Sequence, residues 1–175
     1  NFSSKGNAAD YGDLTTDMRE PAPIGNSTRG IFAGGNTPSA DSNIIMYVTI
    51  ATIGNALDFG DLTVARKKAG SANSPTRGCT GGGETPSNSD VIDYVTIGST
   101  GNAVDFGDLT VARYSVNGAS NSSRCVFMGG APASPGSTLD YVTIASTGNA
   151  VAFGDLTYTG TQGAGGNSNG HGGLS

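Results

Sequence analysis

Aspartates that recur at a fixed spacing are the residues of this sequence that could do chemistry. One column comprises Asp13, Asp61, Asp108 and Asp155, and a second comprises Asp10, Asp58 and Asp105. Carboxylates gathered in a ring could bind Ca²⁺, which takes about six to eight oxygen ligands. Ala152 interrupts the second column, however, and an Asp that caps turn amides explains Asp beside Gly more simply. We therefore expect no cofactor, with calcium on the first column as the alternative.

Cations recur in the same way. Arg29, Arg77 and Arg124 form a third column, and His171 stands in the equivalent place near the C-terminus. Such cations could surround a channel and bind an anionic ligand, or they could form salt bridges to the aspartate columns, which is the interpretation we favour. His171 is the only histidine, which argues strongly against a His-based metal site or a Ser-His-Asp triad.

The tripeptide DFG, at Asp58–Gly60 and Asp105–Gly107, matches a metal-binding element of protein kinases. It recurs here without the catalytic and glycine-rich loops that kinase chemistry requires. A β-bulge or turn, in which Gly frees the backbone beside a packed Phe, accounts for the same residues. We therefore predict no catalytic residue and no enzymatic activity.

Two further motifs are weak. Sequons at Asn26 and Asn121 fall in the same loop of two units, where Ser74 replaces Asn in the third. They would be glycosylated only in a secreted protein of a glycosylating host, and chance matches are the default in so Asn- and Ser-rich a chain. Cys79 and Cys125 lie one position out of register, so we expect them on opposite faces of equivalent strands, as packing residues without a disulfide.

All these residues belong to an internal repeat. GNALDFGDLT at Gly54–Thr63 recurs at Gly101–Thr110 and Gly148–Thr157, and a related copy lies at Gly6–Thr15, so the copies start 47 or 48 residues apart. The segment YVTI and a glycine pair keep the same period. Repeats of this kind bury their apolar faces against their neighbours, and the sequence therefore specifies architecture more clearly than ligand.

The elements of one unit can be read from local patterns. Ser74–Gly83 predicts a strand that runs into a tight turn at the Gly pair, and Asp93–Ile97 predicts a second strand. A Gly-Asn turn precedes a third strand, in which Val104, Phe106 and Leu109 are expected to face inward. A weak fourth strand is expected near Thr110–Tyr114. Helical periodicity is absent.

Composition supports short strands and tight turns and restricts the partners. The 175 residues include 29 glycines, no Trp, 35% hydrophobic and 7% aromatic residues. A net charge of −5 and a pI near 4.5 argue against nucleic acid. No apolar run approaches the ~20 residues that a spanning helix needs, so no membrane insertion is expected. A start at Asn1 without Met indicates a processed or truncated N-terminus.

The expected fold is all-β. A unit of about 47 residues matches a β-propeller blade, because propeller repeats run to ~40–50 residues; a β-solenoid is the alternative. We divide the single repeat domain of residues 1–175 into a partial unit at 1–27, repeats at about 28–74, 75–121 and 122–168, and a closing segment at 169–175. Pairing of Asn169–Leu174 with the Tyr11–Thr15 strand would close four blades; an arc of a larger propeller is the other possibility.

Several of these residues resemble a known family. The glycine pair, the following Tyr-bearing strand and Arg66 or Arg113 at the unit boundary are similar to kelch repeats, although the Trp typical of kelch is missing. More specifically, DYVTI followed by STGNAVDFGDLTVAR, and SNGHGGL at Ser168–Leu174, resemble the kelch-like repeats of tail-associated virion proteins of marine bacteriophages, notably cyanophages. The resemblance implies a virion or appendage protein without catalytic residues.

The function that we expect is therefore a non-enzymatic structural and adhesive module of a phage tail or virion, located in the virion or outside the cell. Its expected partners are other virion proteins, further copies of itself, or a host-surface glycan or receptor. The alternative is a subunit of a microbial extracellular filament or surface layer, joined head to tail. A carbohydrate-active enzyme is less favoured, because glycoside hydrolysis normally needs two suitably spaced carboxylates.

Overall fold

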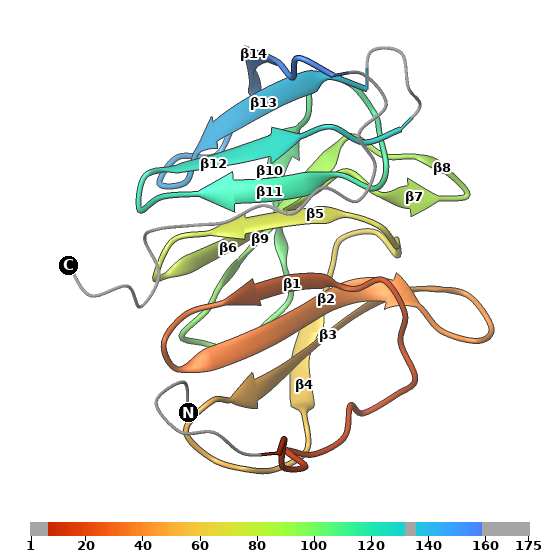
Figure 1. Ribbon diagram of the computed structural model, residues 1–175, viewed down its shortest axis with the longest axis vertical. Helices are drawn as coiled ribbons and strands as arrows, with labels where there is room; N and C mark the ends of the chain where they lie inside the picture. The colour runs from red at the N-terminus through yellow and green to blue at the C-terminus, as the bar shows by residue number, and fades with distance from the viewer. Residues whose placement is uncertain (1–6, 132–135, 159–175) are drawn as a thin grey trace.

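The chain forms three four-stranded antiparallel sheets, one for each repeat, and they lie one above another (Figure 1). The computed structural model describes residues 7–131 and 136–158. Within these residues the chain is all-β, as the sequence predicted, and no helix is present. The strands of the first sheet are β1 (Ala22–Gly25), β2 (Arg29–Asn36), β3 (Asp41–Thr49) and β4 (Leu57–Asp61).

The second and third sheets repeat the order of the first. The second consists of β5 (Gly70–Asn73), β6 (Arg77–Gly81), β9 (Val91–Thr96) and β10 (Val104–Asp108), with the short hairpin β7 (Glu84–Thr85) and β8 (Ser87–Asn88) inserted between β6 and β9. The third consists of β11 (Asn117–Ser120), β12 (Arg124–Met128), β13 (Thr138–Thr143) and β14 (Val151–Asp155). Each sheet is thus a meander of strands that neighbour one another along the chain.

The fourth strand of each sheet is not where the sequence pattern placed it. Residues 110–114 form no strand, and only Tyr114 makes an isolated bridge, to Ala131. The strand that completes the next sheet is β11, which pairs with β12 from Asn117 to Ser120. The prediction was wrong because β11 is polar and small, so its place in the sheet depends on pairing with β12 and not on an apolar pattern of its own.

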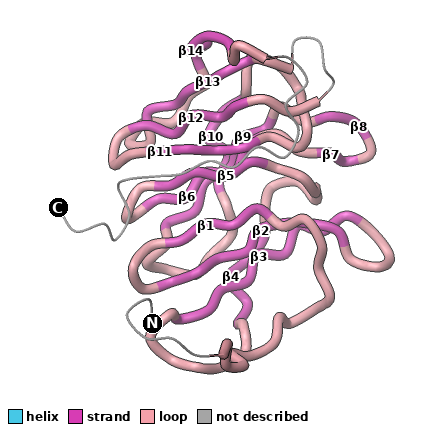
Figure 2. The backbone as a smooth tube through the Cα atoms, in the orientation of Figure 1, coloured by secondary structure: helices cyan, strands magenta, loops and turns pink. Residues whose placement is uncertain are grey.

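The first strands β1, β5 and β11 lie side by side along one edge of the three sheets (Figure 2). Because β5 and β11 come at the ends of sequence repeats 28–74 and 75–121, each of the last two sheets takes its first strand from the preceding repeat. This exchange ties each unit covalently into the next sheet, so that successive sheets cannot separate without losing a strand.

Two apolar cores fill the spaces between the sheets. Ile45, Phe59 and Leu62 of the first unit pack with Val95 and Ile97 of the second. The equivalent residues Ile92, Phe106 and Leu109 pack with Val142 and Ile144 of the third. Phe106 and Leu109 are therefore buried as predicted, whereas the inward position predicted for Val104 was wrong: it is 52% exposed and lies outside the core cluster.

The repeated DFG tripeptide has a structural role. The register of β9 and β10 shifts between Asp105 and Gly107, which is the signature of a β-bulge, and Phe106 between them is buried. The ring of Phe106 meets Tyr94 edge-to-face, with centroids 5.8 Å apart. This confirms the bulge interpretation: the extra residue bends the strand and directs the aromatic ring into the core.

Candidate functional site

The deepest charges of the described residues are two ion pairs, each between the connection that leaves one sheet and a strand of the next sheet. A nitrogen of Arg66 lies 2.9 Å from a carboxylate oxygen of Asp93, and Arg113 lies 2.7 Å from Asp140 in the same way. Each guanidinium also donates to a backbone carbonyl, that of Thr80 or Phe127. All four charged side chains are almost fully buried.

Local sequence explains how each carboxylate is held. The hydroxyl and the backbone N–H of Thr63 donate to Asp93, and those of Thr110 donate to Asp140. Burial lowers the pKa of the Arg66 guanidinium, and the Asp93 carboxylate opposes that shift. Such a pair is stable only while both charges are present, because either one alone would be buried without compensation.

The first unit shows what happens where the carboxylate is missing. Met46 stands at the position of Asp93 and Asp140, and the hydroxyl of Thr15 donates to its sulfur at 2.7 Å. Arg19, the counterpart of Arg66, is exposed. Arg66 and Arg113, which lie on the connections between two described sheets, are buried against an aspartate, whereas Arg19, which precedes the first sheet and has Met46 at the matching position, is exposed.

The Arg29 column does not pair with the aspartate columns. Arg29, Arg77 and Arg124 instead lie over the rings of Tyr47, Tyr94 and Tyr141, 4.3 to 4.8 Å from the ring centroids. Arg29 and Arg77 also each donate to a carbonyl of the following sheet, Ile97 or Ile144, at 2.8 Å.

The preferred salt-bridge interpretation of the Arg29 column was therefore wrong. A Tyr ring contacts each of these cations, and a carbonyl one sheet away also accepts from Arg29 and Arg77; only the tertiary structure brings those groups within reach. Sequence spacing had located the column but not its partners.

The first aspartate column lies at contacts between units. The backbone N–H groups of Asp13, Asp61 and Asp108 donate to the side-chain carbonyls of Asn55, Asn102 and Asn149. Burial, and to a lesser degree Asp90 and Asp105, raise the pKa of Asp108. Among the described residues no three acidic, His or Cys side chains converge as metal ligands. Asp155 accepts from the hydroxyl of Ser137, and His171 lies outside the described residues.

Both sequon asparagines cap turns. The side-chain oxygen of Asn26 accepts from the N–H groups of Thr28 and Arg29, and its amide donates to the Pro75 carbonyl. Asn121 accepts from Ser123 and Arg124 in the same way. Ser74 accepts from Arg77 at the matching place in the second sheet. The repeated feature is therefore an oxygen that caps the turn three residues before an arginine.

The two cysteines are free, as predicted, yet they meet in one core. Cys79 lies on β6 and Cys125 on the equivalent strand β12, and their side chains are on opposite faces of these strands. Cys79 therefore faces the third sheet and Cys125 faces the second. The sequence argument was right about the faces, but it did not consider that opposite faces of stacked sheets are turned toward each other. A hydrogen bond with the Cys79 thiol, together with burial, raises the pKa of Cys125.

This raised pKa makes the unfolding free energy depend on alkaline pH. The thiol stays protonated in the native protein but ionises in the unfolded chain above its ordinary value of 9.0, so stability is fully present below pH 9 and falls as the pH rises further. We expect urea unfolding midpoints to drop more between pH 8 and pH 10 in the parent protein than in Cys125→Ala. Equal drops in the two proteins would contradict this role for the thiol.

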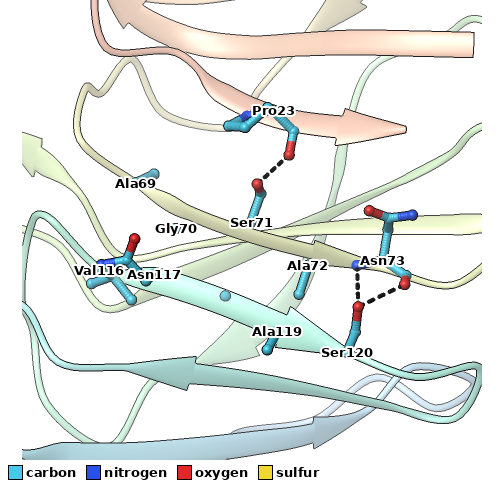
Figure 3. A pocket seen from close by; sticks show the side chains of 11 residues that line it. Pro23, Ala69, Gly70, Ser71, Ala72, Asn73, Val116, Asn117, Ala119 and Ser120 are labelled. Carbon is cyan, nitrogen blue, oxygen red and sulfur yellow. Dashed lines mark hydrogen bonds between the residues drawn. The ribbon is translucent and has the colours of Figure 1, made fainter. Parts of the chain in front are cut away.

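A polar groove of about 280 Å³ lies where the first strands meet, between residues 69–73 and 116–120 and beside Pro23 (Figure 3). The hydroxyl of Ser71 donates to the Pro23 carbonyl, and the hydroxyl of Ser120 both accepts from the Asn73 N–H and donates to its carbonyl. No charged residue lines it. The groove could therefore bind a neutral ligand that carries hydrogen-bonding oxygens.

One glycine and one amide shape this groove. A Cβ on Gly118 would lie 2.0 Å from the Ser71 carbonyl oxygen, so the close approach of β11 to β5 requires glycine. The buried side-chain nitrogen of Asn117 has no hydrogen-bond partner among the described residues. Local sequence did not reveal the groove, because its lining residues are small, polar and scattered over three sheets.

Comparisons with known proteins add no family to these observations. Neither the scan against protein-family models nor the search of curated proteins found a match for this chain. Over residues 7–131 and 136–158, the structure has no helix long and apolar enough to cross a membrane.

Proposed function

We propose that this chain is a non-enzymatic structural and adhesive module of the β-propeller type, displayed outside the cell on a phage tail or virion. The observation that carries the proposal is the use of the recurring charged and polar residues in contacts between sheets. Arg66 and Arg113 pair with aspartates of the next sheet, Arg29 and Arg77 reach carbonyls of the next sheet, and Asn102 and Asn149 join successive units. Because these residues are engaged in contacts between sheets, they favour a structural role over a catalytic one.

The propeller form of the proposal is supported by the arrangement of the sheets. They stack with their first strands adjacent, and β5 and β11 are each supplied by the preceding repeat. In a closed propeller the same exchange would join the last blade to the first, which leaves no exposed sheet edge. The sequence resemblance to tail-associated virion proteins supplies the proposed location.

The adhesive part of the proposal places a neutral, hydroxyl-rich ligand such as a surface glycan in the groove beside Asn117. Binding of the purified chain to host cells or to extracted surface glycans is expected to weaken in Asn117→Ala, which removes a polar side chain from the groove lining. Asn88→Ala, an exposed change on β8, is the matched control and should bind like the parent. Unchanged binding by Asn117→Ala would remove the groove from the proposal, and absence of the protein from purified virions by mass spectrometry would contradict the location.

A second candidate function is a subunit of an extracellular filament or surface layer. It is favoured by the outer face of the third sheet, where Phe153 is 55% exposed. Negative-stain microscopy of native material separates the two candidates, because helical polymers without capsids would favour the filament.

A further inference from the structure

The outer face of the third sheet presents a surface that the first two sheets bury. Phe59 and Phe106 are each 2% exposed because the next sheet covers them, whereas Phe153 at the equivalent position is 55% exposed. Its ring still meets Tyr141 edge-to-face at 5.8 Å, as Phe59 meets Tyr47 and Phe106 meets Tyr94. No sheet of the described residues covers this face of the third sheet, as the next sheet covers the other two.

The contacts that cover such a face are the same at each internal boundary. From the second unit, Gly101 N–H donates to the Phe59 carbonyl and Ala103 N–H to the Asp61 carbonyl, both at 2.7 Å. The Asn102 side chain accepts from Asp61 N–H at 3.1 Å. Residues 148–150 of the third unit repeat all three bonds on Phe106 and Asp108. A Gly-Asn-Ala segment is thus what this face binds.

A glycine on the covered face allows the approach. Gly60 and Gly107 have φ of +143° and +140°, and a Cβ on either would lie 2.5 Å from the carbonyl carbon of the glycine that opens the incoming segment. Gly154 has the same conformation, with φ +148°, but no described atom lies within 4 Å of a Cβ built there. No described residue donates to the carbonyls of Phe153 or Asp155 as the internal segments do.

The chain carries one more Gly-Asn-Ala segment, at positions 6–8 of the sequence. Asn7 and Ala8 are exposed. The residues that follow them are held at the other end of the molecule, where Gly54 N–H donates to the Tyr11 carbonyl and Ala56 N–H to the Asp13 carbonyl, against the first sheet. The first and third sheets lie at opposite ends of the stack (Figure 1), so this segment meets the Phe153 face most directly in another molecule.

We propose that the outer face of the third sheet binds the Asn7–Ala8 segment of a second copy of this chain. Asn7 of that copy accepts from Asp155 N–H, Ala8 N–H donates to the Asp155 carbonyl, and the Ala8 methyl packs beside Phe153. Because the two surfaces differ, the contact is heterologous and extends head to tail into rings or filaments. The proposal goes beyond the adhesive function and rests on the same exposed face as the filament candidate; a monomeric adhesin would contradict it without affecting adhesion.

Sedimentation velocity over a range of protein concentrations tests this contact. The parent protein is expected to form oligomers that grow with concentration, and Gly154→Ala should abolish them by placing a methyl group where the segment must approach. Ala8→Asp should also abolish them, because its counterparts Ala56, Ala103 and Ala150 are buried at the internal boundaries. Ala9→Asp is the matched control, because its counterparts Leu57, Val104 and Val151 are exposed.

Mixing the two defective variants identifies the partner surfaces. Gly154→Ala retains an intact N-terminal segment and Ala8→Asp retains an intact third sheet, so the mixture should form heterodimers and nothing larger. A parent protein that stays monomeric at every concentration, as it would if another segment of its own chain covered Phe153, overturns the proposal. Oligomers that survive in Gly154→Ala, or that Ala9→Asp disrupts as strongly as Ala8→Asp, also overturn it.

Discussion

Replacing Asp140 by alanine is expected to lower the free energy of unfolding by about 3 to 5 kcal/mol, because it leaves the Arg113 cation buried without its partner. Arg113 lies 2.7 Å from Asp140 and is almost fully buried. Its remaining hydrogen bond, to the Phe127 carbonyl at 3.3 Å, does not neutralise the charge. Urea or thermal unfolding followed by circular dichroism measures the loss.

The matched control for this prediction is Asp41→Ala. Asp41 also forms a salt bridge, with Lys67 at 3.0 Å, but both side chains of that pair are partly exposed to solvent. Its removal should cost at most about 1 kcal/mol. The double variant Arg113→Met, Asp140→Met, which places at position 140 the residue found at Met46, should recover most of the loss. Similar losses for Asp140→Ala and Asp41→Ala would show that the buried pair is not what holds these sheets together.

Gly107→Ala is expected to destabilise the protein by about 1 to 3 kcal/mol more than Gly154→Ala. Both glycines have positive φ, at +140° and +148°, so both substitutions strain the backbone alike. Only at Gly107 would the new Cβ also meet the next unit, 2.5 Å from the Gly148 carbonyl carbon. The difference between the two variants therefore isolates the close approach of one unit to the next.

The measurement for this pair is the unfolding free energy at low protein concentration, where the third sheet of each variant is uncovered. Asn102→Ala provides an independent check on the same kind of boundary, because it removes the hydrogen bond to Asp61 N–H without any clash. It should cost about 0.5 to 1.5 kcal/mol. Equal losses for Gly107→Ala and Gly154→Ala would mean that the boundary yields to the extra methyl group.

The candidate site could be predicted only in part. Spacing alone picked out the aspartates of the first column, the Arg29 column and the asparagine turns, and all of them lie at repeated structural positions. The sequence analysis did not pair Arg66 with Asp93. The two residues are 27 positions apart, and the same separation recurs between Arg113 and Asp140. That recurrence was a usable signal, because Arg66 and Arg113 are each followed 27 residues later by an aspartate.

The repeat of the sequence by itself determined that the chain is all-β and that its units are alike, because alternating apolar residues and turn glycines act over a few neighbouring residues. It also determined the bulge at Phe106 and the opposite faces of Cys79 and Cys125. Only the tertiary structure decided which faces meet. Stacking of the sheets brings the two thiols together, sets Arg29 and Arg77 under the next sheet, opens a groove beside Asn117 and leaves Phe153 uncovered. Those outcomes depend on contacts between residues far apart in the chain, which no local pattern encodes.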